Sequence, residues 1–388
     1  MTTTTTPGAD AYAIPQEFQD FRDTIRDLVQ GEVAPRAAEI DAKAEYPWDV
    51  RKAFADHDLL GLPFPEQYGG TATGTLMLNI AVEEVAKACA SSSLILMIQE
   101  LGTLPIQLHG TEEQKQAWLP RCASGEWSPA FCLSEPEAGS DPGAMRTTAV
   151  RDGDEWVING TKNWITNLGV ADFYVVFAKT DPQAARSRGI SAFVVEADRP
   201  GFSVGKLEHK LGIKGSPTGQ PIFEDVRVPH ENLIGEAGKG MHVALGTLDH
   251  SRLGVAAQAV GIAQGATDHA AAYARERRQF GQPIADFQGI QFKLADMETR
   301  TAAARELLYR ACAKIDRGDP DAGKYSAMAK LFASDTAMAV TVDAVQVLGG
   351  YGYVTEYPVE RYLRDAKITQ IYEGTNEIQR LVIARSLR

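Results

Sequence analysis

The hydrophobic periodicity changes twice along the chain, and this change restricts the possible folds more than any other feature of the sequence. At the start, Phe18, Phe21, Ile25 and Leu28 recur at three- and four-residue steps, which is typical of one apolar face of a helix. Short apolar runs between turn residues begin near residue 127, and helical spacing returns near residue 240. The sequence therefore predicts an N-terminal helical domain (1–127), a middle β-barrel-like domain (128–239) and a C-terminal four-helix-bundle domain (240–388).

Individual elements of the first domain can also be assigned. Val50, Phe54 and Leu59 share helical spacing and indicate a second helix. We expect this helix to end at Pro63 and Pro65. Thr111, with a glutamine three positions later, predicts a capping box at the start of a further helix.

The middle domain carries the signals of strands and tight turns. Asn159-Gly160 lies between two strand-like runs and predicts a hairpin turn. Further apolar runs at 173–178, 190–195 and 221–228 predict strands of a sandwich or barrel.

In the last domain, residues 240–277 are rich in alanine and glycine, which favours a closely packed helix. A second helix follows over 290–308, and Asp319-Pro320 is typical of the start of a third. We expect a final helix at 376–388.

Composition excludes several functional classes. The formal charge of −12 disfavours a nucleic-acid binder and a protein that binds anionic membranes, although a local basic pocket could still hold a small anion. The four cysteines lie far apart, which favours a reducing compartment over disulfides or a zinc site. The head MTTTTTPGAD has no signal or transit features, and the longest continuous apolar runs are too short to span a bilayer. A cytoplasmic enzyme is the resulting expectation.

Common cofactor motifs are absent. The chain contains no G-x-G-x-x-G between a strand and a helix, no phosphate-binding P-loop and no G-x-S-x-G elbow. The seven histidines lack ligand spacing, so we expect no catalytic metal. A nucleotide cofactor, if there is one, would be held without a Rossmann unit.

Two segments near the β domain could face a flat polar ligand. Residues 131–141 (FCLSEPEAGSD) offer hydroxyls and backbone N–H groups, but they could equally form an ordinary turn. In residues 163–166 (NWIT), an indole and a hydroxyl lie two positions apart on one face of an expected strand, and a buried core tryptophan is the alternative.

Three further segments lie in the last domain. In residues 275–281 (RERRQFG), two adjacent arginines beside a phenylalanine could clamp a pyrophosphate or merely complement a helix dipole. The glycines of 346–350 (QVLGG) allow close approach to a phosphate or simply cap a helix. In residues 371–380 (IYEGTNEIQR), Glu373 follows an apolar stretch. Burial would raise its pKa above the usual value of about 4.3 and make it a stronger base, unless it is a solvated loop residue.

Together these segments resemble the acyl-CoA dehydrogenase family, in the family's order and over essentially the whole chain. The similarity extends to LDHSR (248–252), FQGIQ (287–291) and QVLGGYG (346–352). Each motif is weak or moderate alone, and their joint occurrence carries the resemblance. It implies the family's three-domain fold and a noncovalent FAD.

The resemblance also implies a role for individual residues. Glu373 matches the catalytic base. The FAD ring would be contacted by Phe131, Cys132, Leu133, Ser134, Trp164, Ile165 and Thr166. The FAD of a neighbouring subunit would be contacted by Arg277, Phe280, Gln288, Gln346, Gly349 and Gly350. Thr375 and Glu377 would approach the cofactor from another side, and the acyl-CoA contacts would be Ser140, Asp249, Arg252 and Gly374.

The implied reaction is α,β-dehydrogenation of an acyl-CoA to the trans-2-enoyl-CoA, with electrons passed to an electron-transferring flavoprotein and a homotetramer as the assembly. A base removes the α-proton while donors stabilise the enolate oxygen, and in the family these donors are the backbone N–H of the base and a flavin hydroxyl. The β-hydrogen leaves as hydride to the flavin.

The position of the base narrows the type of enzyme. Isovaleryl-type and long-chain-type members place it where this chain has Ser251, so the chain is similar to the short-, medium- or branched short-chain type. Glu137 stands where the family often has glycine, which puts that loop in doubt if φ is positive there. An acyl-CoA oxidase and a non-catalytic binding relative are the competing readings. Chain length favours the dehydrogenase over the oxidase, and retention of Glu373 argues against the binder. The sequence leaves acyl-chain length and pathway open, whether fatty acid metabolism or branched-chain amino acid degradation.

Overall fold

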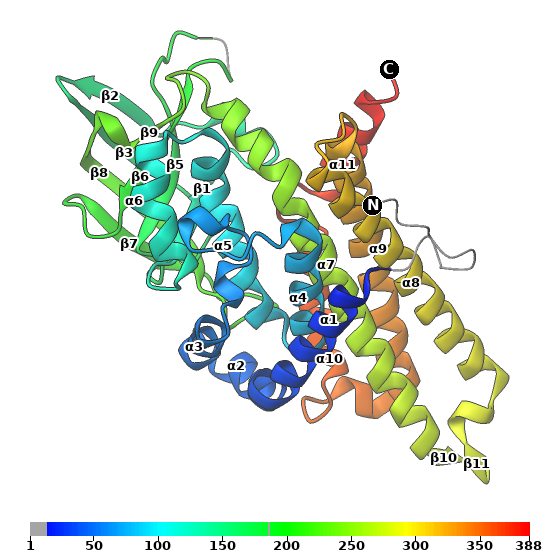
Figure 1. Ribbon diagram of the computed structural model, residues 1–388. Coiled ribbons are helices and arrows are strands. Elements are labelled where there is room, and N and C mark those ends of the chain that lie inside the picture. Colours follow the sequence, from blue (N-terminus) through cyan, green and yellow to red (C-terminus); the bar gives the residue numbers. More distant parts are fainter. Residues whose placement is uncertain (1–13, 185–186) are drawn as a thin grey trace.

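The structure is a computed structural model that describes residues 14–184 and 187–388, so the polar head expected at the N-terminus lies outside the described residues. The first third of the chain is helical and the strands begin at Pro129 (Figure 1). The N-terminal helices are α1 (Gln16–Leu28), α2 (Ala37–Lys43), α3 (Trp48–Asp56), α4 (Gly74–Ala88), α5 (Ala90–His109) and α6 (Glu112–Ala123).

Two of these helices, α4 and α5, form the interior of the domain, and most of their residues are buried. The capping box is confirmed: Thr111 Oγ1 accepts the Gln114 N–H at 3.2 Å and Gln114 Oε1 accepts the Thr111 N–H at 3.0 Å. The predicted end of the second helix is wrong, because α3 stops at Asp56 and Asp58 turns the chain with φ of 57°. Leu59 belongs to a separate 3₁₀ turn.

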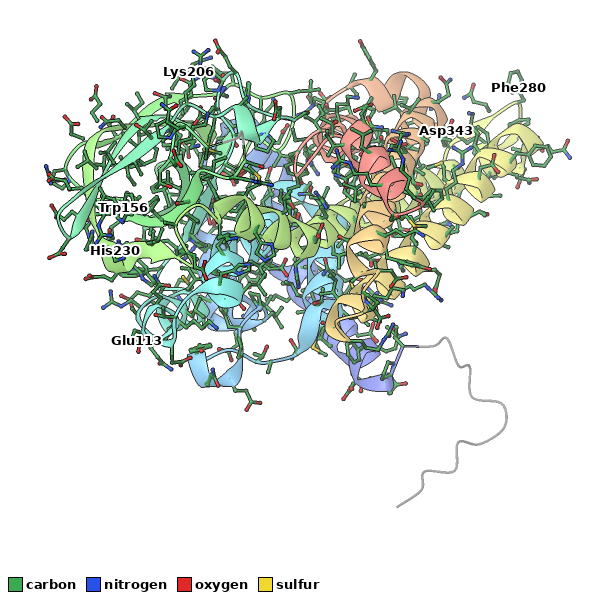
Figure 2. All side chains as sticks on the ribbon, turned by 90° about the horizontal axis from the view of Figure 1, so that it is seen from above. Glu113, Trp156, Lys206, His230, Phe280 and Asp343 are labelled. Atoms are coloured by element: carbon green, nitrogen blue, oxygen red, sulfur yellow. The ribbon has the colours of Figure 1, made fainter. Side chains whose placement is uncertain are left out.

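The middle of the chain forms a nine-stranded sheet in the order β4-β8-β3-β2-β5-β6-β9, with β1 on β5 and β7 on β8. Its central strand β5 is almost entirely buried, which explains its unbroken apolar sequence. Near the start of β3, Trp156 Nε1 donates to His230 Nδ1 at 3.0 Å (Figure 2). The strands are β1 (Pro129–Cys132), β2 (Thr148–Asp152), β3 (Glu155–Thr161), β4 (Ile165–Thr166), β5 (Phe173–Lys179), β6 (Ile190–Glu196), β7 (Phe202–Leu207), β8 (Thr218–Pro229) and β9 (Leu233–Ile234).

The hairpin prediction at Asn159-Gly160 is wrong. Both residues lie inside β3, where the register with β8 shifts. The real two-residue turn joins β2 to β3 at residues 153–154, because Asp152 pairs with Glu155. Gly160 is needed for close packing instead: its φ is 149°, and a Cβ there would lie 2.4 Å from Thr147 Oγ1. The side-chain amide of Asn159 donates to the Asp225 carboxylate at 2.9 Å.

The last third is a helical bundle around one very long helix, α7, which packs against α4 and α5 on one side and α8 and α9 on the other (Figure 1). The run of alanine and glycine in α7 allows this close approach, since a Cβ at Gly261 would lie 2.3 Å from the Glu83 carbonyl oxygen. The elements are α7 (Gly240–Glu276), β10 (Arg278–Gln279), β11 (Gln282–Pro283), α8 (Gln288–Asp316), α9 (Ala322–Leu348), α10 (Val359–Thr369) and α11 (Asn376–Arg385).

Three details of this bundle differ from the sequence predictions. Helix α9 starts at Ala322 rather than at Asp319-Pro320, because the Asp319 carboxylate binds Arg317 and Lys314 and caps no N–H. Helix α10 was not predicted. By length and composition, the segment from Ala322 to Tyr353 is also apolar enough to cross a membrane, although no continuous apolar run suggested it. Its contacts with α7, α8, α10 and α11 are those of a central bundle helix.

Candidate active site

Glu373 lies in the short turn between α10 and α11, beside the middle of α7. It is one of the few non-glycine residues with a left-handed backbone, at φ of 53°, and Gly374 follows at 90°. A Cβ at Gly374 would lie 2.8 Å from Gln379 Nε2, so glycine is required there. Within the described residues, the Glu373 N–H donates to no group, which leaves one donor available beside the carboxylate. Strained backbone of this kind persists only where the surroundings fix it.

Helix α7 holds this turn from one side. The Ser251 hydroxyl donates to Glu373 Oε2 at 2.6 Å. The Arg252 guanidinium, which is buried and paired with Asp249 at 2.6 Å, also donates to the Glu373 carbonyl oxygen at 3.4 Å. The predicted substrate residues Asp249 and Arg252 therefore lie beside the predicted base.

Helices α9 and α11 and the preceding tyrosine hold the turn from the other sides. The buried Lys330 ammonium donates to the Gly374 carbonyl oxygen at 2.9 Å, and Gln379 Nε2 donates to the same oxygen at 2.9 Å. The Tyr372 hydroxyl donates to Gln258 Oε1, and Gln258 is fixed in turn by donating to Ser93 Oγ at 3.0 Å. Most of these donors bind backbone oxygens or neighbouring side chains, so the carboxylate keeps its basicity.

The electrostatics of the turn favour a carboxyl group that titrates near neutral pH. Burial raises the pKa of Glu373 to about 7, against the lowering effects of Ser251, Arg252 and Lys330. The side chain itself is half-buried rather than sealed, so a bound molecule can reach it. Burial also lowers the pKa of Lys330 to about 7, opposed by the attraction of Glu373. A carboxylate with a pKa close to the ambient pH is suited to general-base catalysis.

The two segments predicted to face a flavin ring lie side by side. The Asn163 N–H donates to the Ser134 carbonyl oxygen at 2.9 Å, and the buried Lys162 ammonium donates to the Leu133 carbonyl oxygen at 3.2 Å. Trp164 is 58% exposed with φ of 62°, so the alternative of a buried core tryptophan is wrong, and so is its expected place on a strand with Thr166. Cys132, Leu133 and Ile165 are buried, whereas Phe131, Ser134 and Thr166 are half-buried.

A buried ion pair supports this surface. Lys162 binds Glu135 at 2.8 Å, and the Glu135 carboxylate also accepts the N–H of Thr147 at 3.0 Å. The doubt about Glu137 is removed, because Glu137 is not among the residues with positive φ and its exposed carboxylate pairs with Arg146 at 2.6 Å. An exposed indole over a rigid loop fits a flat aromatic ring system such as that of FAD.

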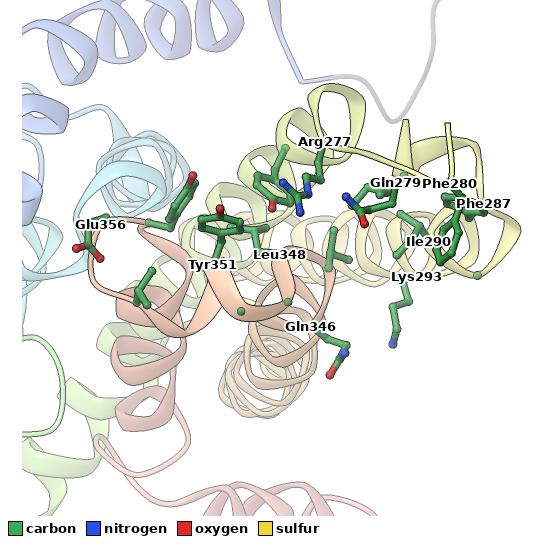
Figure 3. A pocket seen from close by; sticks show the side chains of 18 residues that line it. Arg277, Gln279, Phe280, Phe287, Ile290, Lys293, Gln346, Leu348, Tyr351 and Glu356 are labelled. Atoms are coloured by element: carbon green, nitrogen blue, oxygen red, sulfur yellow. The ribbon is translucent and has the colours of Figure 1, made fainter. Parts of the chain in front are cut away.

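A groove of about 1010 Å³ lies at the far end of the bundle (Figure 3). Arg277 stands over the Tyr351 ring at 5.5 Å, and Phe280 is 94% exposed at the tip of the β10–β11 hairpin. This lining suits a nucleotide: an arginine can bind phosphates, aromatic rings can stack on a base, and glycines allow the backbone to approach closely. Five of the residues predicted to contact a neighbour's FAD line this groove: Arg277, Phe280, Gln346, Gly349 and Gly350.

Four predicted residues fall outside the groups described so far. Gln288 starts α8 next to the groove but does not line it. Ser140 lies exposed in the loop after β1 and has no hydrogen bond to Asp249 or Glu373. Thr375 and Glu377 begin α11, directly after the Glu373 turn, where the Thr375 hydroxyl caps the helix.

The groove and the Glu373 turn are far apart within one chain. Arg252 lies beside Glu373, and the 24 residue steps of α7 from Arg252 to Glu276 span about 36 Å at the rise of a helix. Figures 1 and 2 agree that the β10–β11 hairpin and Phe280 lie away from the sheet. The candidate phosphate groove of one chain therefore lies far from the Glu373 turn of the same chain.

Sequence reasoning missed several residues of the turn. Ser251 was considered only because other types of the family place the base at that position. The sequence analysis assigned no role to Lys330, Gln258 or Gln379. A lysine flanked by apolar residues in α9 and a serine directly before Arg252 were the available signals.

Comparisons with known proteins identify the family of this chain. Models for the N-terminal, middle and C-terminal domains of acyl-CoA dehydrogenase match residues 15–126, 130–226 and 238–388. The short-chain specific acyl-CoA dehydrogenase of Clostridium acetobutylicum is 48% identical, covering 96% of this chain and 98% of its own length.

Two solved structures are also similar along the whole chain. Butyryl-CoA dehydrogenase from Megasphaera elsdenii superposes with a TM-score of 0.94 at 44% identity, covering 97% of this chain and 99% of that chain. A structure described as the electron transferring flavoprotein of Acidaminococcus fermentans contains a chain with a TM-score of 0.94 at 46% identity, covering 97% and 98%. This chain belongs to the acyl-CoA dehydrogenase family and is an FAD-dependent oxidoreductase that acts on acyl-CoA.

Proposed function

We propose that the enzyme oxidises short or branched short-chain acyl-CoA to the trans-2-enoyl-CoA, with Glu373 as the base, and passes the electrons to an electron-transferring flavoprotein. The observation that carries this proposal is the Glu373 turn. A carboxylate with a pKa near 7, fixed by Ser251 and by donors on its backbone, lies beside an N–H group that has no partner among the described residues.

The chemistry needs both groups at once. The α-proton of a thioester is weakly acidic, so a base removes it only if the negative charge that develops on the carbonyl oxygen is stabilised. In this turn, the Glu373 carboxylate accepts the proton and its own N–H can donate to the thioester oxygen. Left-handed φ at Glu373 presents both groups from one residue.

FAD, when bound, supplies the acceptor for the β-hydride. The residues present fit it in two places. The exposed Trp164 and the Ser134 loop offer a surface for the ring, and the Arg277 groove offers cationic and aromatic contacts for the nucleotide end. Arg252, Asp249 and Gly374 would position the thioester against Glu373, and Ser140 would contact it from the β domain.

The choice of a short chain rests on two supports. The base stands in the turn before α11 rather than at Ser251, and Ser251 Oγ lies 2.6 Å from the carboxylate. The relatives named above include a short-chain specific enzyme and a butyryl-CoA dehydrogenase. Branched short chains remain part of the proposal.

The assembly and the electron acceptor are also part of the proposal. Because the groove and the Glu373 turn of one chain are about 36 Å apart, a second copy would have to bring its groove to the cofactor. We expect a homotetramer built from such pairs. The similarity to a chain in an electron transferring flavoprotein structure supports that class of acceptor.

The test is anaerobic titration of the purified holoenzyme with butyryl-, isobutyryl-, 2-methylbutyryl- and octanoyl-CoA. The proposal predicts that the four-carbon and five-carbon thioesters bleach the flavin fastest. Fastest bleaching by octanoyl-CoA would contradict the chain-length claim. Protein that contains no flavin and takes none up would refute the whole proposal.

A further inference from the structure

Helices α5 and α7 pack antiparallel with one constant register next to the Glu373 turn. Gln258 Nε2 donates to Ser93 Oγ at 3.0 Å, and a Cβ at Gly254 would lie 3.3 Å from Met97. Each step forward on α5 thus matches an equal step back on α7. The same register holds at the far end of α5, where the rings of His109 and His242 lie 5.3 Å apart.

This register puts Glu100 opposite Ser251. Glu100 lies three residues after Met97 on α5, and Ser251 lies three residues before Gly254 on α7, so both stay in the interface. Ser251 is the residue whose hydroxyl binds Glu373. A second carboxyl group therefore faces the catalytic carboxylate from the opposite helix.

The carboxyl group of Glu100 lacks a partner in the part of the chain that the structure describes. Glu100 is 6% exposed, and among the described residues it takes part in no side-chain hydrogen bond and no ion pair. Burial raises the pKa of Glu100 to about 8, with further increases from the Glu373 and Asp316 carboxylates. At neutral pH it is therefore mostly protonated, with one O–H to donate and one oxygen to accept.

Buried polar groups in folded proteins are nearly always paired, and an unpaired one is costly. The acyl group of the substrate must approach Glu373 at its α-carbon, so its next atoms lie against the α5–α7 interface. A plain alkyl chain would bury Glu100 without a partner. A hydroxyl or amide on the chain would supply the missing hydrogen bonds.

We propose that Glu100 is a specificity-determining residue that selects acyl-CoA thioesters whose short acyl chain carries an uncharged hydrogen-bonding group beyond the β-carbon. The proposal rests on the function proposed above and narrows its substrate class. A carboxylate-ended chain is disfavoured, because the Glu373 and Asp316 carboxylates would repel it. The cations beside Glu373 are already engaged, Arg252 by Asp249 and Lys330 by Gly374 and Asn376.

The experiment compares matched thioesters on the holoenzyme. Butyryl-CoA is paired with 4-hydroxybutyryl-CoA, pentanoyl-CoA with 5-hydroxypentanoyl-CoA, and glutaryl-CoA is the charged five-carbon arm. The measured quantity is the ratio of kcat/KM for the hydroxyacyl over the alkyl thioester. We expect wild type to favour the hydroxyacyl thioester at one chain length or both, and Glu100→Leu to lower that ratio by about 10-fold or more.

Two variants separate hydrogen bonding from shape. Glu100→Gln keeps a donor and an acceptor and is expected to stay within about threefold of the wild-type ratio. Met97→Leu changes shape one turn earlier on the same face without removing a polar group, and we expect it to leave the ratio unchanged.

The outcomes are distinct. A wild-type preference for the alkyl thioester at both lengths would overturn the inference, even if Glu100→Leu failed to fold. A higher kcat/KM for glutaryl-CoA than for the hydroxyacyl thioesters would also overturn it. If no acyl-CoA bleached the wild-type flavin, the proposed function itself would fail, whereas ready bleaching by butyryl-CoA with an unaltered ratio in Glu100→Leu would remove only the role of Glu100.

Discussion

The Nζ atom of Lys330 lies 2.9 Å from the carbonyl oxygen of Gly374, so a fully buried ammonium holds the residue next to Glu373, the proposed base. It also donates to Asn376 Oδ1 at 2.9 Å, which ties the turn to the start of α11. The charge matters as well as the bonds, because Lys330 lowers the pKa of Glu373 against the effect of burial. We regard Lys330 as a positioning residue that acts through the turn.

Replacing Lys330 with methionine tests this role. Loss of the ammonium raises the pKa of Glu373, so the rising limb of kcat/KM against pH is expected to move up by about one pH unit. The matched control is Ser326→Ala, one turn earlier on α9, whose buried hydroxyl has no partner among the described residues. If the rising limb of kcat/KM stays at the wild-type pH in fully flavinated Lys330→Met enzyme, Lys330 does not have this role.

Ser251 tunes the same carboxylate directly. Its hydroxyl donates at 2.6 Å to the ionised form of Glu373 and so lowers its pKa. In Ser251→Ala the base should stay protonated to higher pH, and we expect the rising limb to shift upward by about one unit. Thr247→Ala, one turn earlier on α7, removes a buried hydroxyl that has no partner in the described part of the chain, and it serves as the control. A downward shift, or equal profiles for both variants, would contradict the assignment.

The raised pKa of Glu373 also predicts how stability depends on pH. Its folded-state pKa of about 7 lies above the unfolded value near 4.5, so the folded protein binds more protons between these pH values. The contribution of Glu373 to stability is therefore lost as pH rises through this window. Glu373→Gln, which cannot ionise, should raise Tm by a few degrees at pH 8 and by less at pH 5, measured by calorimetry at saturating FAD. A larger gain at pH 5 than at pH 8 would show that the sign is wrong.

Arg277 should affect cofactor retention more than chemistry. It lies over the Tyr351 ring in the groove, far from Glu373 in the same chain. We expect Arg277→Ala to lose FAD on dilution, with the turnover of the flavinated fraction changed by less than about tenfold, as followed by flavin absorbance after gel filtration. Arg275→Ala is the control, because Arg275 is exposed in the last turn of α7 and does not line the groove. Equal FAD retention in the two variants would exclude the groove as a cofactor site.

The sequence was sufficient to predict the order of helical and β segments, because that order depends on local periodicity. The apolar run of β5 and the alanine-rich α7 each lie close to their predicted bounds. Local signals gave wrong predictions where tertiary contacts determine the backbone conformation. Asn159-Gly160 reads as a turn, but Asp225 binds the asparagine and Thr147 packs against the glycine. Asp319 reads as a cap, but two cations bind its carboxylate.

The site shows the same division. Glu373, Asp249 and Arg252 were found by motif and lie together in the structure. The left-handed φ of Glu373 and the contacts of Lys330 depend on residues more than 40 positions away in sequence, so no local pattern encodes them. Glu100 is the clearest case, because its significance comes from a helix register that pairs it with Ser251.

The most direct test of the account is single-turnover anaerobic mixing of butyryl-CoA with wild-type and Glu373→Gln enzyme, both fully flavinated. The account predicts that both bind the thioester and that flavin bleaching is slower in the variant by about 10³-fold or more. Bleaching of Glu373→Gln at close to the wild-type rate would contradict the assignment of Glu373 as the base.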